Sequence, residues 1–385
     1  MATRKPLVRI AGKNQQLPAA DSLDVPGSRF HEGPTEPTIK SYGDRWLQDT
    51  TGIEYTWVDP GVWVDLNEAT AADVAASIHA ATSKTTPIDT DELGIADSAA
   101  SYVLKKLTWA NLKATLLAYF KGQFREKLTA ARTYYVRTDG SDSNDGLANT
   151  SGGAFLTIQK AIDTATALDN GGFDITITVG AGTFAARNYL KTIIGSGRIL
   201  IGGAGDTTII APGVAGPCFG DSSSSGWLGV YDITSMKLAP TVAGCWGFGS
   251  VYGQGGILLF GSINFAFGAV GGVNIQVGRG GFVGNANRNY TISAGATQHM
   301  AVYDCGHIRT QACTVTLTGT PAFSNYFAVA QRGGIILANG NTYSGSATGQ
   351  RFVASQGGGI LVSGAGTSYF PGNSGSTATT PGWYE

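Results

Sequence analysis

The sequence predicts a mainly β protein whose second half is a parallel β-helix, a coil of short strands stacked turn upon turn. Between Gly255 and Leu361 a short phrase recurs five times: Gly, then Gly or His, then an apolar residue. The apolar anchors lie 25, 26, 27 and 25 residues apart, at Ile257, Phe282, Ile308, Ile335 and Ile360. A period of this length marks a repeat architecture, and a propeller blade would need about 40 residues. At ~3.3 Å per residue, one period gives a coil with a contour of roughly 80 Å.

The repeats carry no helical signal. Short apolar or alternating runs are broken by Gly, Asn and Ser, as in residues 333–345, which indicates several strands joined by tight turns. Coils of a β-helix stack about 4.8 Å apart, so equivalent residues form ladders along the axis. We therefore expect the five anchors to form one inward-facing ladder. The glycines beside them would occupy corners that need positive φ or close backbone approach.

The composition agrees with a turn-rich β protein. The chain has 385 residues, of which 42% are hydrophobic, 14% are charged and 56 are glycine. A net charge of −1 predicts no nucleic-acid partner. The sequence has no run of 18 apolar residues, so we do not expect it to insert into a membrane. Met1–Arg9 lacks the apolar centre of a signal peptide, so we expect synthesis in the cytoplasm.

The cysteines do not have the spacing of a metal site or a redox motif, and we expect no cofactor. We predict that all four are small buried hydrophobes in the bore of the β-helix. They are Cys218, Cys245, Cys305 and Cys313.

Residues 1–66 are predicted to be an extended arm rich in Pro and Trp, with one short β-hairpin. The hairpin pairs Ile53–Val58 with Gly61–Leu66 across Asp59-Pro60. A segment this small cannot hold itself together alone, so we expect it to pack against copies of itself or against a larger assembly.

Residues 67–132 are predicted to be helical. A first helix covers Asn67–Ala81, and a second region covers Asp97–Leu128, where Thr108 suits the cap of a helical restart. The second region carries apolar residues in a 4-3-4-3 pattern, the spacing of a coiled-coil seam: Val103, Leu107, Ala110, Ala114 and Leu117. The pattern fits a trimerising neck or a helical hairpin with its own small core. We favour the neck because a β-helix follows directly.

The large domain is predicted to cover residues 133–385. It opens with an acidic loop whose oxygen-bearing side chains would suit a metal ion such as calcium, or a solvated turn held by its own hydrogen bonds: Asp139, Asp142, Asn144 and Asp145. We favour the turn because the bidentate Glu and fixed spacing of an EF-hand are missing. A short amphipathic helix over Phe155–Asp163 follows, with one apolar face made of Ile158, Ala161, Ile162 and Ala165.

Less regular coils are expected next. Strands are predicted at Ile175–Val179, Ile193-Ile194, Ile199–Ile201 and Thr208–Ala211. Asp221–Gly226, with four serines in a row, is predicted to be an exposed loop. The regular coils then run to about Phe370, before a polar tail over Ser374–Trp383.

Three segments resemble known proteins. Tyr134–Ile162, with its Asp139-Gly-Ser-Asp142 loop, resembles the start of pectate-lyase-like right-handed β-helix domains, in which the helix plugs the bore. Pro87–Leu116 resembles the neck of bacteriophage tail fibres and tailspikes, and Val8–Pro18 resembles the virion-attachment end of such proteins. The resemblance implies a homotrimeric fibre or spike on a virion. Residues 1–66 would dock on other tail or head proteins, and the β-helix would bind a host surface glycan.

Many β-helix spikes cleave polysaccharides, so catalysis has to be considered. Hydrolysis of a glycosidic bond usually needs two carboxylates roughly 5–10 Å apart. Residues 241–385 contain one Asp, Asp304, and one Glu, Glu385. A pair would need a carboxylate from a partner chain or from the early coils, at Asp206, Asp221 or Asp232.

The best catalytic candidates are Asp304, His307 and Arg309, which lie within one coil. We prefer to interpret them as surface residues that alternate with inward Cys305 and Ile308.

The ligand-binding candidates are Arg279, Arg332 and Tyr303. The two arginines occupy the same phase of the repeat two coils apart, about 10 Å along the axis, and suit acidic sugars. A tyrosine ring suits stacking on a sugar. The sequence thus favours an attachment protein that binds without cleaving. A polysaccharide depolymerase and a particle decoration without a receptor remain open.

Overall fold

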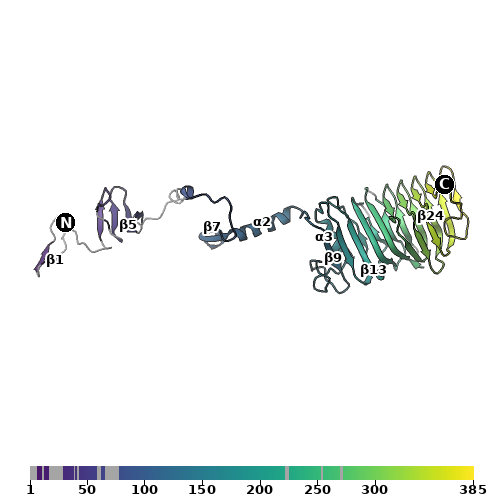
Figure 1. Ribbon diagram of the computed structural model, residues 1–385, viewed down its shortest axis with the longest axis horizontal. Helices are drawn as coiled ribbons and strands as arrows, with labels where there is room; N and C mark the ends of the chain where they lie inside the picture. Colours follow the sequence, from purple (N-terminus) through teal and green to yellow (C-terminus); the bar gives the residue numbers. More distant parts are fainter. Residues whose placement is uncertain are drawn as a thin grey trace. The chain divides into compact units, whose positions relative to one another are not determined.

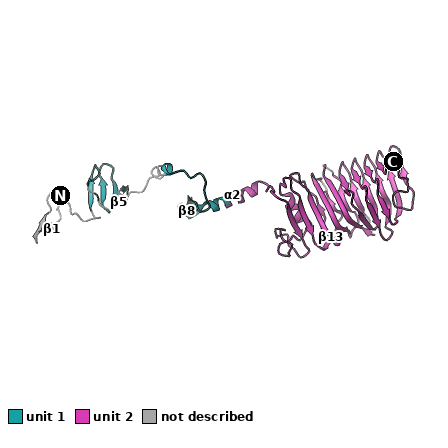
Figure 2. Cartoon of the chain, in the orientation of Figure 1, with its two compact units in different colours: residues 1–113 teal, residues 114–385 magenta. Residues whose placement is uncertain are grey.

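The computed structural model describes residues 7–10, 13–16, 29–38, 40, 43–58, 62–65, 78–221, 225–252, 255–268 and 272–385. The chain forms two compact units, residues 1–113 and 114–385 (Figure 2). The division falls inside helix α2 (Trp109–Gln123). In the part of the chain that is described, every helix is too short or too polar to cross a membrane.

Unit 1 contains the predicted hairpin. Strands β5 (Ile53–Val58) and β6 (Val62–Asp65) pair antiparallel, which confirms the prediction. They belong to a four-stranded sheet with β3 (Phe30–Gly33) and β4 (Arg45–Gln48), and Trp46 is buried on it. A separate antiparallel pair is formed by β1 (Leu7–Ile10) and β2 (Lys13–Gln16).

The predicted helix over 97–128 is only partly correct. Strands β7 (Glu92–Asp97) and β8 (Val103–Thr108) form an antiparallel hairpin, with a single 3₁₀ turn at Ser98–Ala100 between them, and only α2 is α-helical. Two residues with positive φ, Ser101 and Tyr102, turn the chain back so that six residue pairs form. This pairing overrides the helical spacing of the apolar residues. Thr108 does cap α2, because its hydroxyl accepts from the Asn111 N–H. Most of the helix predicted over 67–81 lies outside the described residues.

Unit 2 is a parallel β-solenoid of about seven turns, consistent with the expected right-handed β-helix (Figure 1). Its first ladder runs through β9 (Arg132–Val136), β10 (Ile175–Val179), β13 (Ile199–Ile210), β15 (Val230–Leu238), β17 (Ile257–Ala266), β19 (Phe282–Gly284), β22 (His307–Arg309), β25 (Ile335–Leu337), β28 (Gly359–Leu361) and β30 (Trp383–Tyr384). Its second ladder runs through β12 (Asn188–Tyr189), β14 (Gly216–Gly220), β16 (Cys245–Ser250), β18 (Val273–Val277), β21 (Ala296–Val302), β24 (Ala322–Ala330), β27 (Thr348–Ala354) and β29 (Thr377–Ala378). Shorter strands join the first ladder at β11 (Gly182–Phe184), β20 (Tyr290–Ala294), β23 (Thr314–Leu317) and β26 (Thr342–Ser344).

Helix α3 (Ile158–Thr166) packs against the first strands of the solenoid, at β9, β10 and β12. Its predicted apolar face is confirmed, since Ile158, Ala161, Ile162 and Ala165 are all buried. Thr157 caps the helix by accepting from the Lys160 N–H. The helix covers core that would otherwise be open at this end of the stack.

The predicted inward ladder is wrong by one residue in three of five coils. The buried column of the first ladder consists of Tyr231, Leu258, Val283, Ile308, Ile336 and Ile360. Ile257, Phe282 and Ile335 stand in the adjacent, partly exposed column together with His307. A shift of one residue moves a side chain to the opposite face of a strand. The anchors Ile308 and Ile360 were therefore predicted correctly, whereas the other three do not face the bore.

The register is set instead by a glycine that ends each turn. A Cβ on Gly334 would lie 2.8 Å from the backbone carbonyl of Val302, and one on Gly358 would lie 2.3 Å from that of Ala330. Only glycine permits this approach of one coil to the previous one. The equivalent residue in the middle coil is Gly306, so His307 takes the outward position and Ile308 the inward one.

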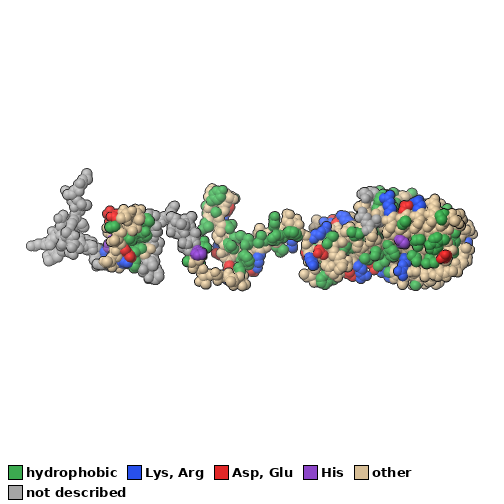
Figure 3. Space-filling view, turned by 90° about the horizontal axis from the view of Figure 1, so that it is seen from above, with side chains coloured by type: hydrophobic (Ala, Val, Ile, Leu, Met, Phe, Trp, Pro, Cys, Tyr) green, Lys and Arg blue, Asp and Glu red, His purple; other side chains and the backbone are tan. Residues whose placement is uncertain are grey.

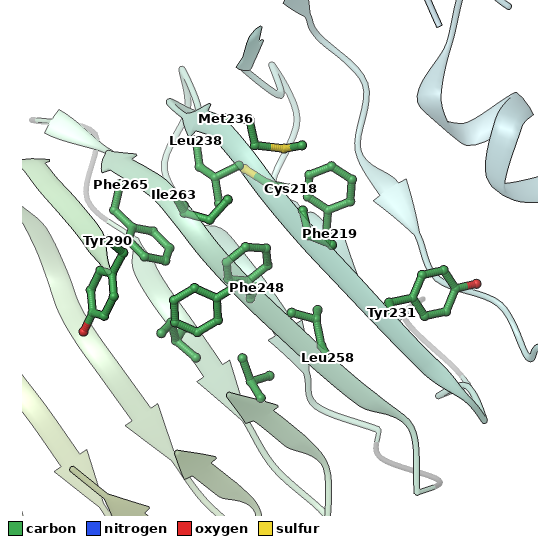
Figure 4. Packing of buried hydrophobic residues seen from close by; sticks show 14 of the residues in the cluster. Cys218, Phe219, Tyr231, Met236, Leu238, Phe248, Leu258, Ile263, Phe265 and Tyr290 are labelled. Atoms are coloured by element: carbon green, nitrogen blue, oxygen red, sulfur yellow. The ribbon is translucent and has the colours of Figure 1, made fainter. Parts of the chain in front are cut away.

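The bore is filled by apolar and aromatic side chains (Figure 4). Three of the cysteines are buried in it as predicted: Cys218, Cys245 and Cys313. Cys305 is an exception, because it lies exposed in a turn at a φ of 60°. A polar cluster lies within the apolar filling: the His299 ring lies 3.0 Å from Asn274 Nδ2 and 2.9 Å from the Tyr290 hydroxyl.

Candidate ligand-binding face

The site begins with a repeated turn between the second ladder and the first. In four coils the two central residues of this turn have positive φ: Arg279-Gly280, Asp304-Cys305, Arg332-Gly333 and Gln356-Gly357. The residue after each pair donates its N–H back across the turn, as Gly306 does to the Tyr303 carbonyl at 2.9 Å. This is the pattern of a type I′ turn. Because the coils are in register, the first central residues form a column along the axis.

That column brings together two of the predicted ligand residues. Asp304 lies between Arg279 and Arg332, one coil from each. Its carboxylate accepts from Arg332 at 2.6 Å and 3.4 Å. This hydrogen bond, and the charges of both arginines, lower the pKa of Asp304. Asp304 is therefore ionised at neutral pH and neutralises one arginine of the column.

Each arginine of the column also covers a tyrosine ring. The guanidinium of Arg332 lies 5.0 Å from the ring centre of Tyr303, and that of Arg279 lies 5.0 Å from Tyr252. The Tyr303 hydroxyl contacts Gln298 at 3.4 Å, and burial raises the pKa of this tyrosine. Guanidinium groups held flat on aromatic rings keep their edge N–H groups available to a ligand.

The three catalytic candidates are not brought together. Asp304 lies in the turn, whereas His307 and Arg309 lie on β22 in the first ladder. His307 stands between Phe282 and Ile335, and Arg309 donates to Gln311. Ile308 faces inward between His307 and Arg309, as the surface interpretation predicts, but Cys305 is exposed in the turn beside Asp304 and does not face inward.

The other carboxylates are also far from Asp304. Asp232 pairs with Arg288 at 2.5 Å, and Asp206 accepts from Asn264 at 2.9 Å, both at the first ladder. Asp221 follows β14, three coils before Asp304, which is about 14 Å along the axis. The separation exceeds the roughly 5–10 Å that a glycosidase pair needs.

The acidic loop uses its oxygens to hold its own backbone. Asp142 accepts from the N–H groups of Leu156 and Thr157 at 3.0 and 2.9 Å, just before α3. Asp145 accepts from Leu147, and Asp139 pairs with Arg137 at 2.8 Å.

The fourth residue of the loop acts as a donor. Asn144 donates to the carbonyls of Ser151 and Ala154. Across the described ranges, no group of three or more His, Cys, Asp or Glu residues is placed to hold a metal ion.

Asp221 was predicted to lie in an exposed loop, but it is only 2% exposed. Its carboxylate accepts from the Tyr252 N–H, and burial raises its pKa to about 6. It lines a cleft with Arg187, Trp246 and Tyr252. Nothing in the sequence around the serine run indicates this burial, because the neighbours come from adjacent coils.

No protein-family description, no curated protein and no solved structure matches this chain.

Proposed function

We propose that this chain is a structural tail fibre, tailspike or head-fibre-like protein of a phage-like particle, which attaches the virion to its host by binding a surface glycan without cleaving it. The observation that carries the proposal is the pairing of Arg279 and Arg332 with tyrosine rings in one column. Such pairs offer hydrogen-bond donors to sugar hydroxyls or acid groups and a flat surface to a sugar ring. A stiff solenoid repeats these weak contacts along its length.

The protein would act as a homotrimer. Helix α2 has no buried residue, and four of its apolar side chains are 43–62% exposed: Leu116, Leu117, Tyr119 and Phe120. Hydrophobic side chains lie open on the surface along this stretch of the chain in Figure 3. Apolar surface of this extent supports association with other copies. Three copies would multiply a modest affinity for a polymeric ligand. Residues 1–66 would dock on another virion protein, as their resemblance to virion-attachment segments suggests.

Glycan binding is tested with the full-length protein on immobilised surface polysaccharides from candidate host strains. We expect the double substitution Arg279→Ala, Arg332→Ala to weaken binding by about tenfold or more, equivalent to at least ~1.4 kcal/mol. Arg309→Ala is the matched control, because it removes an exposed arginine from the other ladder. Equal binding by the double variant and the control would refute the role of the column.

The alternative is a polysaccharide depolymerase, and the raised pKa of Asp221 is the observation that favours it. The polysaccharides that bind are incubated with the protein and assayed for new reducing ends. We expect none. Release that Asp304→Asn or Asp221→Asn abolishes would replace binding by catalysis as the function.

A further inference from the structure

A cleft of about 200 Å³ lies beside the second ladder. It is lined by coils that precede those of Asp304 and Arg332. Four consecutive strands or their flanks contribute to it. The side chains that matter are Arg187, Tyr189, Asp221, Trp246, Tyr252 and Gln276. None of them except Asp221 was singled out by the sequence, because no single repeat contains the set.

The hollow lies at two coils that carry no side chain in one column of the ladder, which begins at Tyr189. Gly220 pairs with Gly249, and Gly249 pairs with Gln276. A Cβ on Gly249 would lie 2.0 Å from Trp246 Nε1, so the indole rests directly on this glycine. In later coils the same column carries Ala301 and Val329, which are both buried.

Three aromatic rings line the cleft. Tyr189, Trp246 and Tyr252 are all half-buried, so each ring is partly fixed by the protein and partly open. Aromatic rings held in this way are suited to stack on the apolar face of a ring-shaped ligand. At about 200 Å³ the cleft is smaller than the roughly 300–1,000 Å³ of sites for drug-sized ligands. It therefore suits a single ring.

The charge of the cleft is positive. Arg187 is held 5.4 Å from the Tyr189 ring centre and spends one N–H on the Ala215 carbonyl at 2.7 Å. An arginine has five such donors, so others are available to a ligand. Arg279 lies over Tyr252 at the rim. Among the described residues, Arg187 forms no ion pair, whereas Arg279 lies near Asp304 and its charge helps to lower the pKa of that carboxyl.

Asp221 is the one carboxylate among the residues that line the cleft, and it is bonded within the protein. Asp221 is turned to the backbone, where it accepts from the Tyr252 N–H and fixes the strand end that carries the Tyr252 ring. Its burial leaves little of it for a ligand to contact. Its role is to position the aromatic wall.

We propose that this cleft binds one acidic sugar residue of the glycan, a pyranose ring that bears a carboxylate. The ring would stack on Trp246 and Tyr252, the carboxylate would pair with Arg187, and Gln276 would bond a hydroxyl. The inference rests on the proposed function and adds to it the ligand class and a site separate from the Arg332–Tyr303 pair. Aromatic walls without the arginines would suit a neutral sugar, and the arginines without the walls would suit any small anion.

The test titrates the full-length protein with four probes by isothermal calorimetry and ligand-observed NMR. The probes are methyl β-glucuronoside, methyl β-glucoside, acetate and inorganic phosphate. We expect the glucuronoside to bind at least tenfold more tightly than the other three. The substitution Arg187→Met keeps the aliphatic stem beside Gly216 and removes the charge, and should lower glucuronoside affinity at least tenfold.

Arg351→Met is the matched control. Arg351 belongs to β27 of the same ladder and likewise donates to one backbone carbonyl, that of Ser374 at 3.0 Å. The Arg351→Met variant should bind methyl β-glucuronoside with the same affinity as the unmodified protein. Equal unfolding temperatures of the two variants exclude misfolding as the cause of any difference.

Each other outcome overturns either the cleft inference or the proposed function. Equal affinity for glucoside and glucuronoside would make the cleft a neutral-sugar site, and equal affinity for phosphate would make it a general anion site. If no probe binds but the protein still binds polysaccharide through Arg279 and Arg332, the cleft inference fails and the proposed function stands. If the glucuronoside binds through Arg187 but no surface polysaccharide binds, the proposed attachment fails and the acidic-sugar site remains.

Discussion

Cys305 occupies a turn position that three equivalent coils give to glycine, at Gly280, Gly333 and Gly357. A side chain at positive φ costs about 1–2 kcal/mol. The greater freedom of glycine in the unfolded chain offsets about 0.5–1 kcal/mol of that. We expect Cys305→Gly to stabilise the protein by about 0.5–1 kcal/mol, visible as a higher unfolding temperature in calorimetry.

The control for this prediction is Cys305→Ser, which removes the thiol but keeps the Cβ and should leave the unfolding temperature unchanged. A gain of the same size in both variants would show that the thiol, rather than backbone strain, limits stability.

His299 gives the core a dependence on pH. The residue is fully buried, and this burial lowers its pKa to about 3. In the unfolded chain an imidazole takes up a proton near pH 6.5, whereas in the folded protein it does so only near pH 3. The unfolded state therefore binds more protons across this window, and stability falls as the pH falls, by up to about 1.4 kcal/mol per pH unit.

This prediction is checked by unfolding temperatures at pH 7, 5 and 4. His299→Gln keeps a polar partner for Asn274 and Tyr290 without a titrating ring, and should lose less stability between pH 7 and 4. His307→Gln, which changes an exposed histidine, should lose as much as the unmodified protein. Identical pH profiles for the His299 variant and the unmodified protein would contradict the assignment.

Site residues were predictable from the sequence where the repeat itself positions them. Arg279 and Arg332 share a phase of the repeat, so their alignment follows from the period. Asp304 between them was identified, but its pairing with Arg332 was not, because the period does not show which residues of a turn face each other. Arg187 and the burial of Asp221 were not predicted, because the neighbours of both residues belong to coils that lie about 30 residues away in the sequence.

At the scale of elements, prediction succeeded where local pattern and tertiary packing agree. Helix α3 has the predicted apolar face at helical spacing, although it begins at Ile158, after the cap Thr157, rather than at Phe155. Residues 103–108 have helical spacing too, yet they form β8. Their partner strand β7 supplies a full set of backbone hydrogen bonds, which the spacing of side chains does not reveal.

Helix α2 carries the prediction of trimerisation. Its apolar residues are exposed in the single chain, and a charge among them should oppose association. We expect Leu117→Glu to convert a trimer into a monomer, measured by analytical ultracentrifugation of the full-length protein. Gln123→Glu adds the same charge at the end of the helix and should remain trimeric.

The structure leaves the predicted coiled-coil seam incomplete. Of the five predicted seam positions, Val103 and Leu107 lie on β8, so only Ala110, Ala114 and Leu117 remain on a helix. Monomeric unmodified protein at high concentration would contradict the homotrimer directly.

At the scale of the molecule, the solenoid turns a linear repeat into columns along an axis. The column of Arg279, Asp304 and Arg332 arises from one turn used three times. The acidic-sugar cleft arises differently, at the coils where Gly220 and Gly249 carry no side chain and the Trp246 indole lies over Gly249. Regular coils thus supply the repeated contacts, and irregular coils supply the hollow.

The sequence by itself determined the period, the β-helix and the end-capping helix, because each depends on side-chain patterns within one coil or one helix. Tertiary structure alone decided which apolar residue of each coil faces the bore. That choice is made by close contact of glycine backbones between coils, which a pattern of apolar residues does not contain. The same reason places Asp221, Arg187 and Trp246 in one cleft: stacking joins residues that the chain keeps a full coil apart.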